Sequence, residues 1–218
     1  MTQTPLDVPA AILQRRSIKS FKPDAIAPEL LQQLIELTVA APSSWNLQDW
    51  RIVVVQNEAK KAELKAACFN QSMVSEAPVS FVFAASTTAW QPEDLAPIFE
   101  QAKAAGAWDD GTIGYFSKAI PQFQKGLGDK TREFAIKDAM IASNNFVLAA
   151  ESLGLSTCYM NGWIEDKVKA VIGAEDREDI VIAVVVPVGY AKEGRNNPGR
   201  LPLSTNVFVD TISQPYQR

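Results

Sequence analysis

The 218-residue sequence contains no histidine. This excludes Ser-His-Asp triads, Cys-His pairs and histidine-based zinc sites such as HExxH. The two cysteines, Cys68 and Cys158, are too few for a four-thiolate site and form no CxxC pair. We interpret them as two buried thiols, and the sequence also permits a disulfide between them. No metal centre is expected.

Positive charge and long apolar runs are also scarce. The net charge is -4 and the pI is about 5.0, so the chain lacks the basic character of nucleic-acid-binding proteins. The longest apolar run, Ile180 to Val188, is interrupted by Pro187 and falls short of the roughly 18 residues of a membrane span. The N-terminal MTQTPLDVPA does not resemble a signal peptide. We therefore expect a cytoplasmic protein without nucleic-acid or membrane partners.

The common phosphate-binding loops are missing. Residues 106–112 (GAWDDGT) lack the lysine of GxxxxGK[ST], and residues 126–128 (GLG) are not followed by the third glycine of GxGxxG. No sequence pattern near the adjacent carboxylates Asp109 and Asp110 indicates a residue with which they would act, and we interpret them as solvated turn residues. A nucleotide would have to be held in another way.

The periodicity of apolar residues predicts a layered α+β or α/β domain, with a buried sheet covered by helices. Residues 90–128 are expected to form helices with irregular joints that cover a site. The arm after Tyr190 is too poor in apolar surface to fold alone, so we expect it to lie on another surface such as a second subunit. Helices are expected over Leu6–Arg16, Pro28–Ala41, from an Asn57 cap to Ala67, Asp129–Leu153 and Ile164–Ile172, and strands over Arg51–Gln56, Val79–Ala85, Leu155–Met160 and Ile180–Gly189.

The first chemical signal is the basic stretch RRSIKSF at residues 15–21. If it is extended, Arg15, Ser17, Lys19 and Phe21 share one face. If it is helical, Arg15 and Lys19 still meet at i, i+4. Arginine, lysine and serine together suit a phosphate group. The alternative is a solvated basic stretch.

The second signal is the loop APSSWNLQDW at residues 41–50, between an expected helix and an expected strand. Its serine, asparagine and glutamine side chains both donate and accept hydrogen bonds, which suits a ligand with ring carbonyls, ring nitrogens and hydroxyls. The alternative is an ordinary polar loop closed by a core tryptophan.

Two weaker signals follow. Met160, Asn161 and Gly162 lie at the end of an expected strand, where the glycine would let a backbone N–H approach a flat ligand. Arg200, in the segment NPGRLP, could close over a phosphate. The alternatives are a strand-to-helix turn and a surface cation.

In this order and at these separations, the signals resemble the nitroreductase family of FMN enzymes. The likeness rests on Arg-x-Ser-x-Lys-x-Phe from residue 15, Pro-Ser-Ser-x-Asn-x-Gln-x-Trp at 42–50, Leu-Gly-Leu at 153–155 and Gly-Arg-Leu-Pro at 199–202. It extends over essentially the whole chain. The resemblance implies an α+β, nitroreductase-like fold with a central mixed β-sheet flanked by helices. It also implies an intertwined homodimer of single-domain subunits (1–218), each with an arm (about 191–218) embracing its partner.

The resemblance also implies an FMN in each of two clefts at the subunit interface. One subunit would hold the phosphate and the ribityl chain, and the other would supply the loop at residues 41–50, called here the serine-rich loop. The backbone near Asn161 and Gly162 would face the reactive flavin nitrogen. The residues implied in cofactor binding are Arg15, Arg16, Ser17, Lys19, Asn70, Met160, Asn161, Gly162 and Arg200, with Pro42, Ser43, Ser44 and Asn46 from the other subunit.

The implied activity is that of an NAD(P)H-dependent flavin oxidoreductase. NADH or NADPH would give a hydride, which a nitroaromatic, quinone or similar flat acceptor would receive in a ping-pong cycle, with no catalytic side chain required. Trp45, Tyr115, Phe116 and Phe123 are candidate walls of the substrate cleft, although aromatic residues are more often core. Two alternatives stay open. One is another flavin enzyme on this fold, acting on an enone, an iodinated phenol or the flavin itself. The other is a flavin-binding protein without significant turnover.

The sequence departs from the family pattern at three positions. Asp49 replaces the usual proline of Asn-x-Gln-Pro-Trp, and Trp45 replaces a common small residue, which is expected to narrow the cleft. Pro198 stands where many relatives have a basic residue, and Arg195 is a candidate replacement for that contact. These departures concern FMN affinity and substrate range more than the fold.

Overall fold

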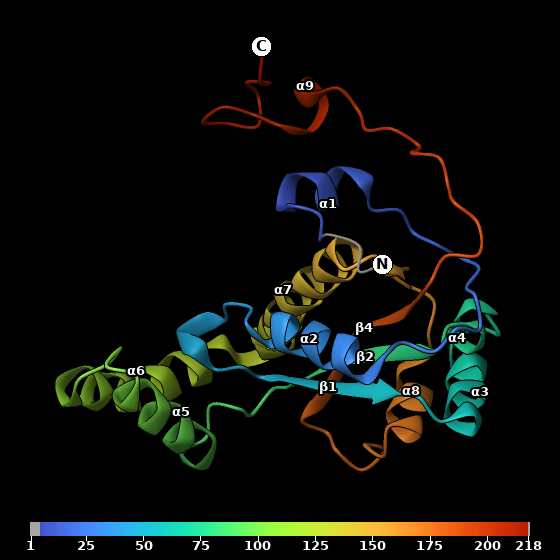
Figure 1. Ribbon diagram of the computed structural model, residues 1–218. Coiled ribbons are helices and arrows are strands. Elements are labelled where there is room, and N and C mark those ends of the chain that lie inside the picture. The colour runs from blue at the N-terminus through green and yellow to red at the C-terminus, as the bar shows by residue number, and fades with distance from the viewer. Residues whose placement is uncertain (1–4, 218) are drawn as a thin grey trace.

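A computed structural model describes residues 5–217 and contains a four-stranded sheet between two layers of helices (Figure 1). The strands lie in the order β1-β2-β4-β3 and every pairing between them is antiparallel. An isolated parallel bridge between Ser17 and Thr157 lies beside these antiparallel pairings. The bounds are Trp50–Val55 for β1, Val79–Ser86 for β2, Ser156–Thr157 for β3 and Ile180–Gly189 for β4.

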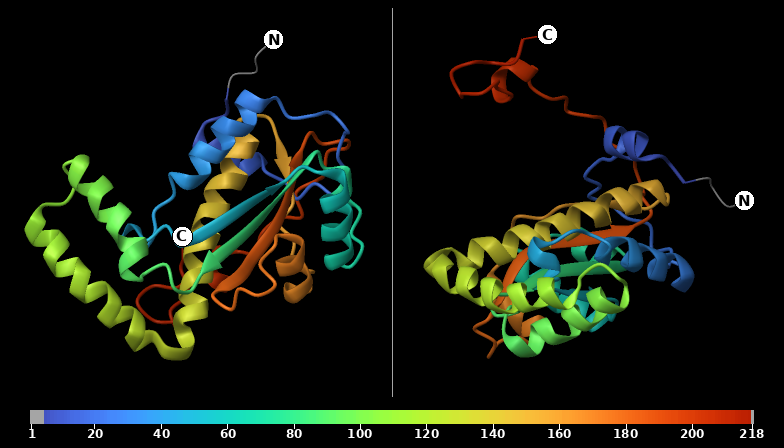
Figure 2. Two further views of the ribbon diagram at one scale, coloured as in Figure 1. Left: turned by 90° about the horizontal axis from the view of Figure 1, so that it is seen from below. Right: turned by 90° about the vertical axis from the view of Figure 1, so that its left-hand side faces the viewer.

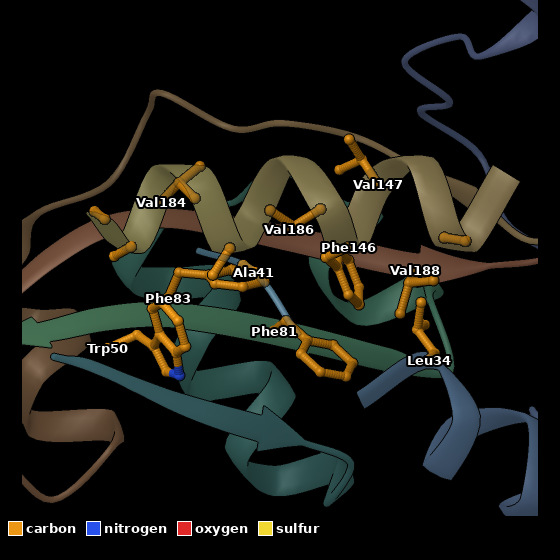
Figure 3. Close-up of a cluster of buried hydrophobic side chains, with 14 of the residues drawn as sticks. Leu34, Ala41, Trp50, Phe81, Phe83, Phe146, Val147, Val184, Val186 and Val188 are labelled. Atoms are coloured by element: carbon orange, nitrogen blue, oxygen red, sulfur yellow. The ribbon is translucent and has the colours of Figure 1, made fainter. Parts of the chain in front are cut away.

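One face of the sheet carries the larger core. Helices α2 (Pro28–Val39) and α7 (Thr131–Ser152) cover this face. Phe81 of β2 packs against Phe146 of α7 with ring centroids 4.4 Å apart, and Phe83 lies 5.4 Å from the same ring (Figure 3). Helix α7 therefore buries the side that meets the sheet.

The opposite face carries a second core beneath α3 (Glu58–Ala67), the short α4 (Met73–Glu76) and α8 (Glu165–Val171). Val82 of β2 and Val185 of β4 point to this side, because successive side chains in a strand alternate between faces. Every residue of β2 and β4 is buried. Helices on both faces explain why these strands read as near-continuous apolar runs.

Local signals fix several helix ends. Pro28 opens α2 at a position where helices accept proline, and the Asn57 side chain accepts a hydrogen bond from the Lys60 N–H at 3.1 Å at the start of α3. Gly154 has φ +80° after α7, and there the Leu155 N–H bonds to the Ala150 carbonyl at 2.8 Å. Helix α1 is shorter than expected, Val8–Gln14, because Asp7 caps it by accepting the Ala10 N–H at 2.8 Å.

The third strand is also shorter than the predicted Leu155–Met160. Its ladder to β4 is interrupted where Cys158 faces Pro187. The Cys158 N–H reaches the Pro187 carbonyl at 3.3 Å, but proline has no N–H to return the second bond. Met160 then rejoins β4 through an isolated bridge to Val185.

Two segments extend from this body (Figure 2). Residues 90–128 form the hairpin of α5 (Pro92–Ala104) and α6 (Asp110–Leu127), with Pro97 and Pro121 inside the helices. The arm after β4 carries the short α9 (Leu203–Asn206), and all of residues 192–217 are exposed. Within residues 5–217 no helix is long and apolar enough to cross a membrane.

Candidate functional site

The basic stretch after α1 and the C-terminal arm line one cavity of about 260 Å³. Arg15, Ser17 and Lys19 form one side, and Arg200 comes from the other. Segments that are about 180 residues apart in the sequence thus line one cavity. The full lining is Arg15, Arg16, Ser17, Lys19, Arg195, Asn196, Asn197, Pro198 and Arg200, and it contains no carboxylate.

Backbone pairing fixes the basic stretch against the sheet. The Ile18 N–H donates to the Thr157 carbonyl at 3.0 Å, and the Lys22 N–H donates to the Tyr190 carbonyl at 2.9 Å. Ile18 and Phe21 are buried in the second core, whereas Ser17 and Lys19 are exposed. The prediction that Phe21 shares the face of Lys19 is wrong, because the apolar ring turns into the core.

The arginines of this cavity differ in what they bind. The Nη1 of Arg15 is buried and has no hydrogen-bond partner within residues 5–217. The Nη1 of Arg16 instead donates to the carbonyls of Leu13, Gln14 and Arg15 at 2.8–2.9 Å, satisfying the end of α1. Arg195 lines the cavity next to Pro198, as its candidate role requires. A buried N–H without an acceptor is unusual in a folded protein and marks a place where an anion can bind.

The same cations affect a neighbouring thiol. Burial raises the pKa of Cys158, and Lys19, Arg15 and Arg195 oppose that rise. Cys68 is also buried, and burial raises its pKa to about 12. Both cysteines are free thiols, as first interpreted.

Residues 160–162 lie beside the end of α3. The Gln71 Nε2 donates to the Gly162 carbonyl and to the Cys68 carbonyl, both at 3.1 Å. A Cβ on Gly162 would lie 2.9 Å from Gln71 Nε2 and 3.3 Å from the Phe69 ring, so the lack of a side chain makes room for these two residues. Asn70 lies between them with φ +57°. These contacts place the segment Phe69–Gln71, which includes Asn70, beside Gly162, and sequence reasoning did not identify Gln71.

The serine-rich loop is held by a residue that sequence reasoning missed. Asp138 of α7 accepts the Ser44 N–H at 2.9 Å and the Ser44 hydroxyl at 3.3 Å. Ser43 Oγ accepts the Gln48 N–H at 3.0 Å, and residues 44–46 form a 3₁₀ turn. Ser44 and Asp138 are 94 positions apart, which explains why no local pattern links them.

The candidate aromatic walls separate into two groups. Trp45 meets Phe123 of α6 edge-on, with ring centroids 4.7 Å apart. Tyr115 and Phe116 lie about two turns earlier on α6, where Phe116 packs against Trp108 at 5.0 Å and Tyr115 is exposed. Trp45 and Phe123 therefore meet directly, whereas Phe116 packs against the same buried cluster as Trp45 and Tyr115 is exposed.

The basic cavity and the serine-rich loop are at opposite ends of the sheet. Ser17 bridges Thr157, which pairs with Val188 of β4. Trp50, which follows the loop, pairs with Ala85 of β2, and Ala85 pairs with Val181 of β4. Val181 and Val188 are seven positions apart along β4, which corresponds to roughly 23 Å at about 3.3 Å per residue. A single chain therefore does not bring the two groups of predicted residues together.

Sequence and structure comparisons agree on one family. The model of the Nitroreductase family matches residues 12–190. A Thermus thermophilus protein named NADH dehydrogenase is 33% identical over 204 residues, covering 93% of this chain and 96% of that protein. Protein DrgA of Synechocystis is 30% identical over 214 residues, covering 95% and 98%.

Solved structures confirm the nitroreductase-like fold. One from Exiguobacterium sibiricum, determined in complex with FMN, matches with a TM-score of 0.86 and 25% identity over 94% of this chain and 98% of that chain. An enone reductase called CLA-ER shares the fold with a TM-score of 0.83 at 21% identity. The family match covers the sheet, both helical layers and the basic stretch after α1. This chain therefore belongs to the nitroreductase family.

Proposed function

We propose that the protein is an FMN-dependent oxidoreductase that transfers a hydride from NADH or NADPH to a flat organic acceptor, such as a nitroaromatic compound or a quinone. The observation that carries the proposal is the carboxylate-free cavity around the buried Nη1 of Arg15, which has no hydrogen-bond partner among the described residues. Such a cation cluster suits a phosphate dianion. The relative named NADH dehydrogenase and the FMN-containing structural neighbour support the choice of cofactor and donor.

The residues present fit FMN. Arg15, Ser17, Lys19 and Arg200 would hold the phosphate and the ribityl chain, with Arg16 completing the cation cluster. Asn70 and the backbone of Met160, Asn161 and Gly162 would contact the ring system. Hydride transfer is the chemistry that FMN supplies when bound. The chain needs no histidine for this work, since its own part is to bind, orient and exclude water.

The site requires a second copy of the chain. Pro42, Ser43, Ser44 and Asn46 are at the far end of the sheet from the basic cavity, so we place them at the FMN of the partner subunit. The arm extends away from the body of the subunit (Figure 1). It exposes Leu201, Leu203 and Ile212, which a partner's surface would cover. We therefore propose that each single-domain subunit reaches around the other in a homodimer.

The acceptor would lie against an aromatic wall. Trp45 and Phe123 meet edge to face beside the serine-rich loop, and Phe123 keeps an exposed surface. Aromatic faces favour flat ligands by stacking. Donor and acceptor would occupy the same place in turn, which gives ping-pong kinetics. We propose that this cycle operates in the cytoplasm, where NADH and NADPH are available.

The test is a visible absorption spectrum of the purified full-length protein, recorded before and after anaerobic addition of NADH or NADPH. The proposal predicts a flavin spectrum that bleaches with at least one donor, and parallel lines in initial-rate plots with a quinone or nitroaromatic acceptor. A protein that stays colourless and takes up no added FMN would refute it. Turnover with an enone but not with the other acceptors would replace the substrate class and keep the cofactor.

A further inference from the structure

Two carboxyl groups are buried together beneath the serine-rich loop. The side chains of Asp49 and Asp138 are only 3% and 1% exposed. Asp49 lines a small cavity with Ala135 of α7, and Asp138 lies one helical turn further on the same helix face. Two like charges at one buried place are strongly disfavoured.

The two carboxyl groups have different partners. Asp138 uses both oxygens to hold Ser44, through its N–H and its hydroxyl. The Oδ1 of Asp49 is buried and has no hydrogen-bond partner within residues 5–217. Asp138 therefore anchors the loop, whereas within residues 5–217 the Oδ1 of Asp49 receives no hydrogen bond that would stabilise a carboxylate.

No ion pair within the described residues reaches Asp49. Arg51 of β1 instead pairs with Asp94 of α5 at 3.5 Å, and Lys137 of α7 lies over the Phe134 ring, 4.1 Å from its centroid. Polar but uncharged groups complete the surroundings, and they are Gln124 of α6, Ser86 and Thr87 at the end of β2, and Thr131 of α7.

The loop above the pair needs its anchors. Trp45, Asn46 and Gln48 have φ values of 47°, 56° and 48°, in the left-handed region of the backbone that residues other than glycine rarely adopt. Such conformations persist only where the surrounding structure enforces them. The bonds from Ser44 to Asp138, and from Gln48 to Ser43, are the local restraints that do so.

We propose that Asp49 is a positioning residue that keeps its proton at neutral pH. Its neutral form lets Asp138 hold the serine-rich loop in the conformation that binds FMN, and loss of the proton releases the loop. The link to FMN rests on the proposed function, whereas the proton on Asp49 can be tested without FMN.

The electrostatics of Asp49 agree with its geometry. Burial, and next the charge of Asp138, raise the pKa of Asp49 from 3.8 to about 8, while its own backbone, Arg51 and Lys137 act in the opposite direction. Between these two pH values the unfolded chain has released a proton that the folded chain keeps. The stability of the folded chain should therefore fall as pH rises from about 4 to 8 and then level off.

The experiment measures the dissociation constant of FMN between pH 6 and 9.5 for the wild type, Asp49→Asn and the control Asp94→Asn. Asparagine imitates the protonated aspartate, and Asp94 is a half-buried acid in the same region that is paired with Arg51. We expect wild-type and Asp94→Asn affinities to fall above pH 8, by up to about tenfold per pH unit, and Asp49→Asn to show no such fall. Parallel profiles for the wild type and Asp49→Asn would overturn the inference.

Melting temperatures of the same full-length chains, measured without FMN from pH 5 to 9, separate this inference from the proposed function. We expect the wild type to lose stability up to pH 8 and Asp49→Asn to be flatter, with the largest difference near pH 8. If no chain binds FMN, the proposed function fails. Parallel melting profiles of the wild type and Asp49→Asn would overturn the inference that Asp49 keeps its proton, whether or not FMN binds. Should Asp49→Asn not fold, Asp49→Leu, similar in size and uncharged, must give the flat profiles instead.

Discussion

The two halves of the proposed FMN site are built in opposite ways. The basic cavity gathers cations in an open place, and the part of the chain that the structure describes offers the Arg15 Nη1 no hydrogen-bond partner. The serine-rich loop rests on the buried Asp138, and its left-handed residues are enforced by bonds within the chain. The basic cavity therefore presents cationic groups that can bind a ligand. In the serine-rich loop, Ser43 and Ser44 already form hydrogen bonds within the chain that hold the loop in its conformation.

This difference separates binding from folding. A substitution in the basic cavity should weaken FMN binding and leave the folded chain intact, because little of the fold depends on that side chain. A substitution beneath the loop should lower the free energy of unfolding first and affect FMN through the shape of the loop. The predictions below test this separation, beginning with the largest effect.

Arg15→Ala should raise the dissociation constant of FMN about 10- to 100-fold, because a hydrogen bond to a charged group contributes about 1.5–3 kcal/mol. The melting temperature of the FMN-free chain should hardly change. Lys22→Ala is the matched control, since it removes one exposed cation from the same segment but does not line the cavity. Fluorescence titration measures both variants, and equal losses in the two would contradict a specific role for Arg15.

Asp138→Ala should lower the free energy of unfolding by about 1–3 kcal/mol, because the Ser44 N–H and hydroxyl lose their acceptor inside the protein. Ser44→Ala keeps the backbone bond and should cost less. Urea unfolding of the FMN-free chains measures both. The distinction between the two halves would be wrong if Asp138→Ala were as stable as Arg15→Ala.

The acid Asp179 should give a pH dependence opposite in sign to that of Asp49. Hydrogen bonds from Arg177, and a further one from Ser86, lower the pKa of Asp179 to about 2. The stability that this carboxylate contributes is present above its unfolded pKa and is lost as pH falls from about 4 to 2. Solvent screening limits the effect to about 1 kcal/mol. Asp179→Asn should reduce the loss measured between pH 5 and pH 2.5, and an unchanged loss would count against this assignment.

Gly162→Ala should have the smallest effect, because the new Cβ would lie 2.9 Å from the flexible end of Gln71. We expect the Gln71 bond to the Gly162 carbonyl to weaken, at a cost of about 0.5 kcal/mol, the lower end of the range for a hydrogen bond. In a Gln71→Ala background the same substitution should cost less. Additive losses in this double-mutant cycle, measured by urea unfolding, would show that the two residues are not coupled.

Much of the fold was predictable because its signals are local. Apolar periodicity marked β2, β4 and α7, and Pro28, Asn57 and Gly154 marked helix ends. The third strand was predicted too long because the ladder depends on Pro187, which belongs to another strand. Local sequence patterns do not reveal which strand will face a proline.

The candidate site was predictable only in part, for the same reason. The cations around Arg15 are close in the sequence, and Arg200 was added through its motif. The residues that hold the site in place are distant in the sequence from the residues they bond. Asp138 is 94 residues from Ser44, and Gln71 is 91 residues from Gly162. Phe21 was placed on the wrong face because its segment forms isolated bridges to the sheet and not a regular strand.

We propose that each FMN site takes its basic cavity from one subunit and its serine-rich loop from the other. The most direct test joins an Arg15→Ala subunit to a Ser44→Ala/Asn46→Ala subunit in a differently tagged heterodimer, after each variant homodimer is shown to retain little FMN. Our account predicts one intact and one doubly altered site, and therefore about one FMN per heterodimer. A heterodimer as poor in FMN as its parents would show that both halves come from one chain and would contradict the account.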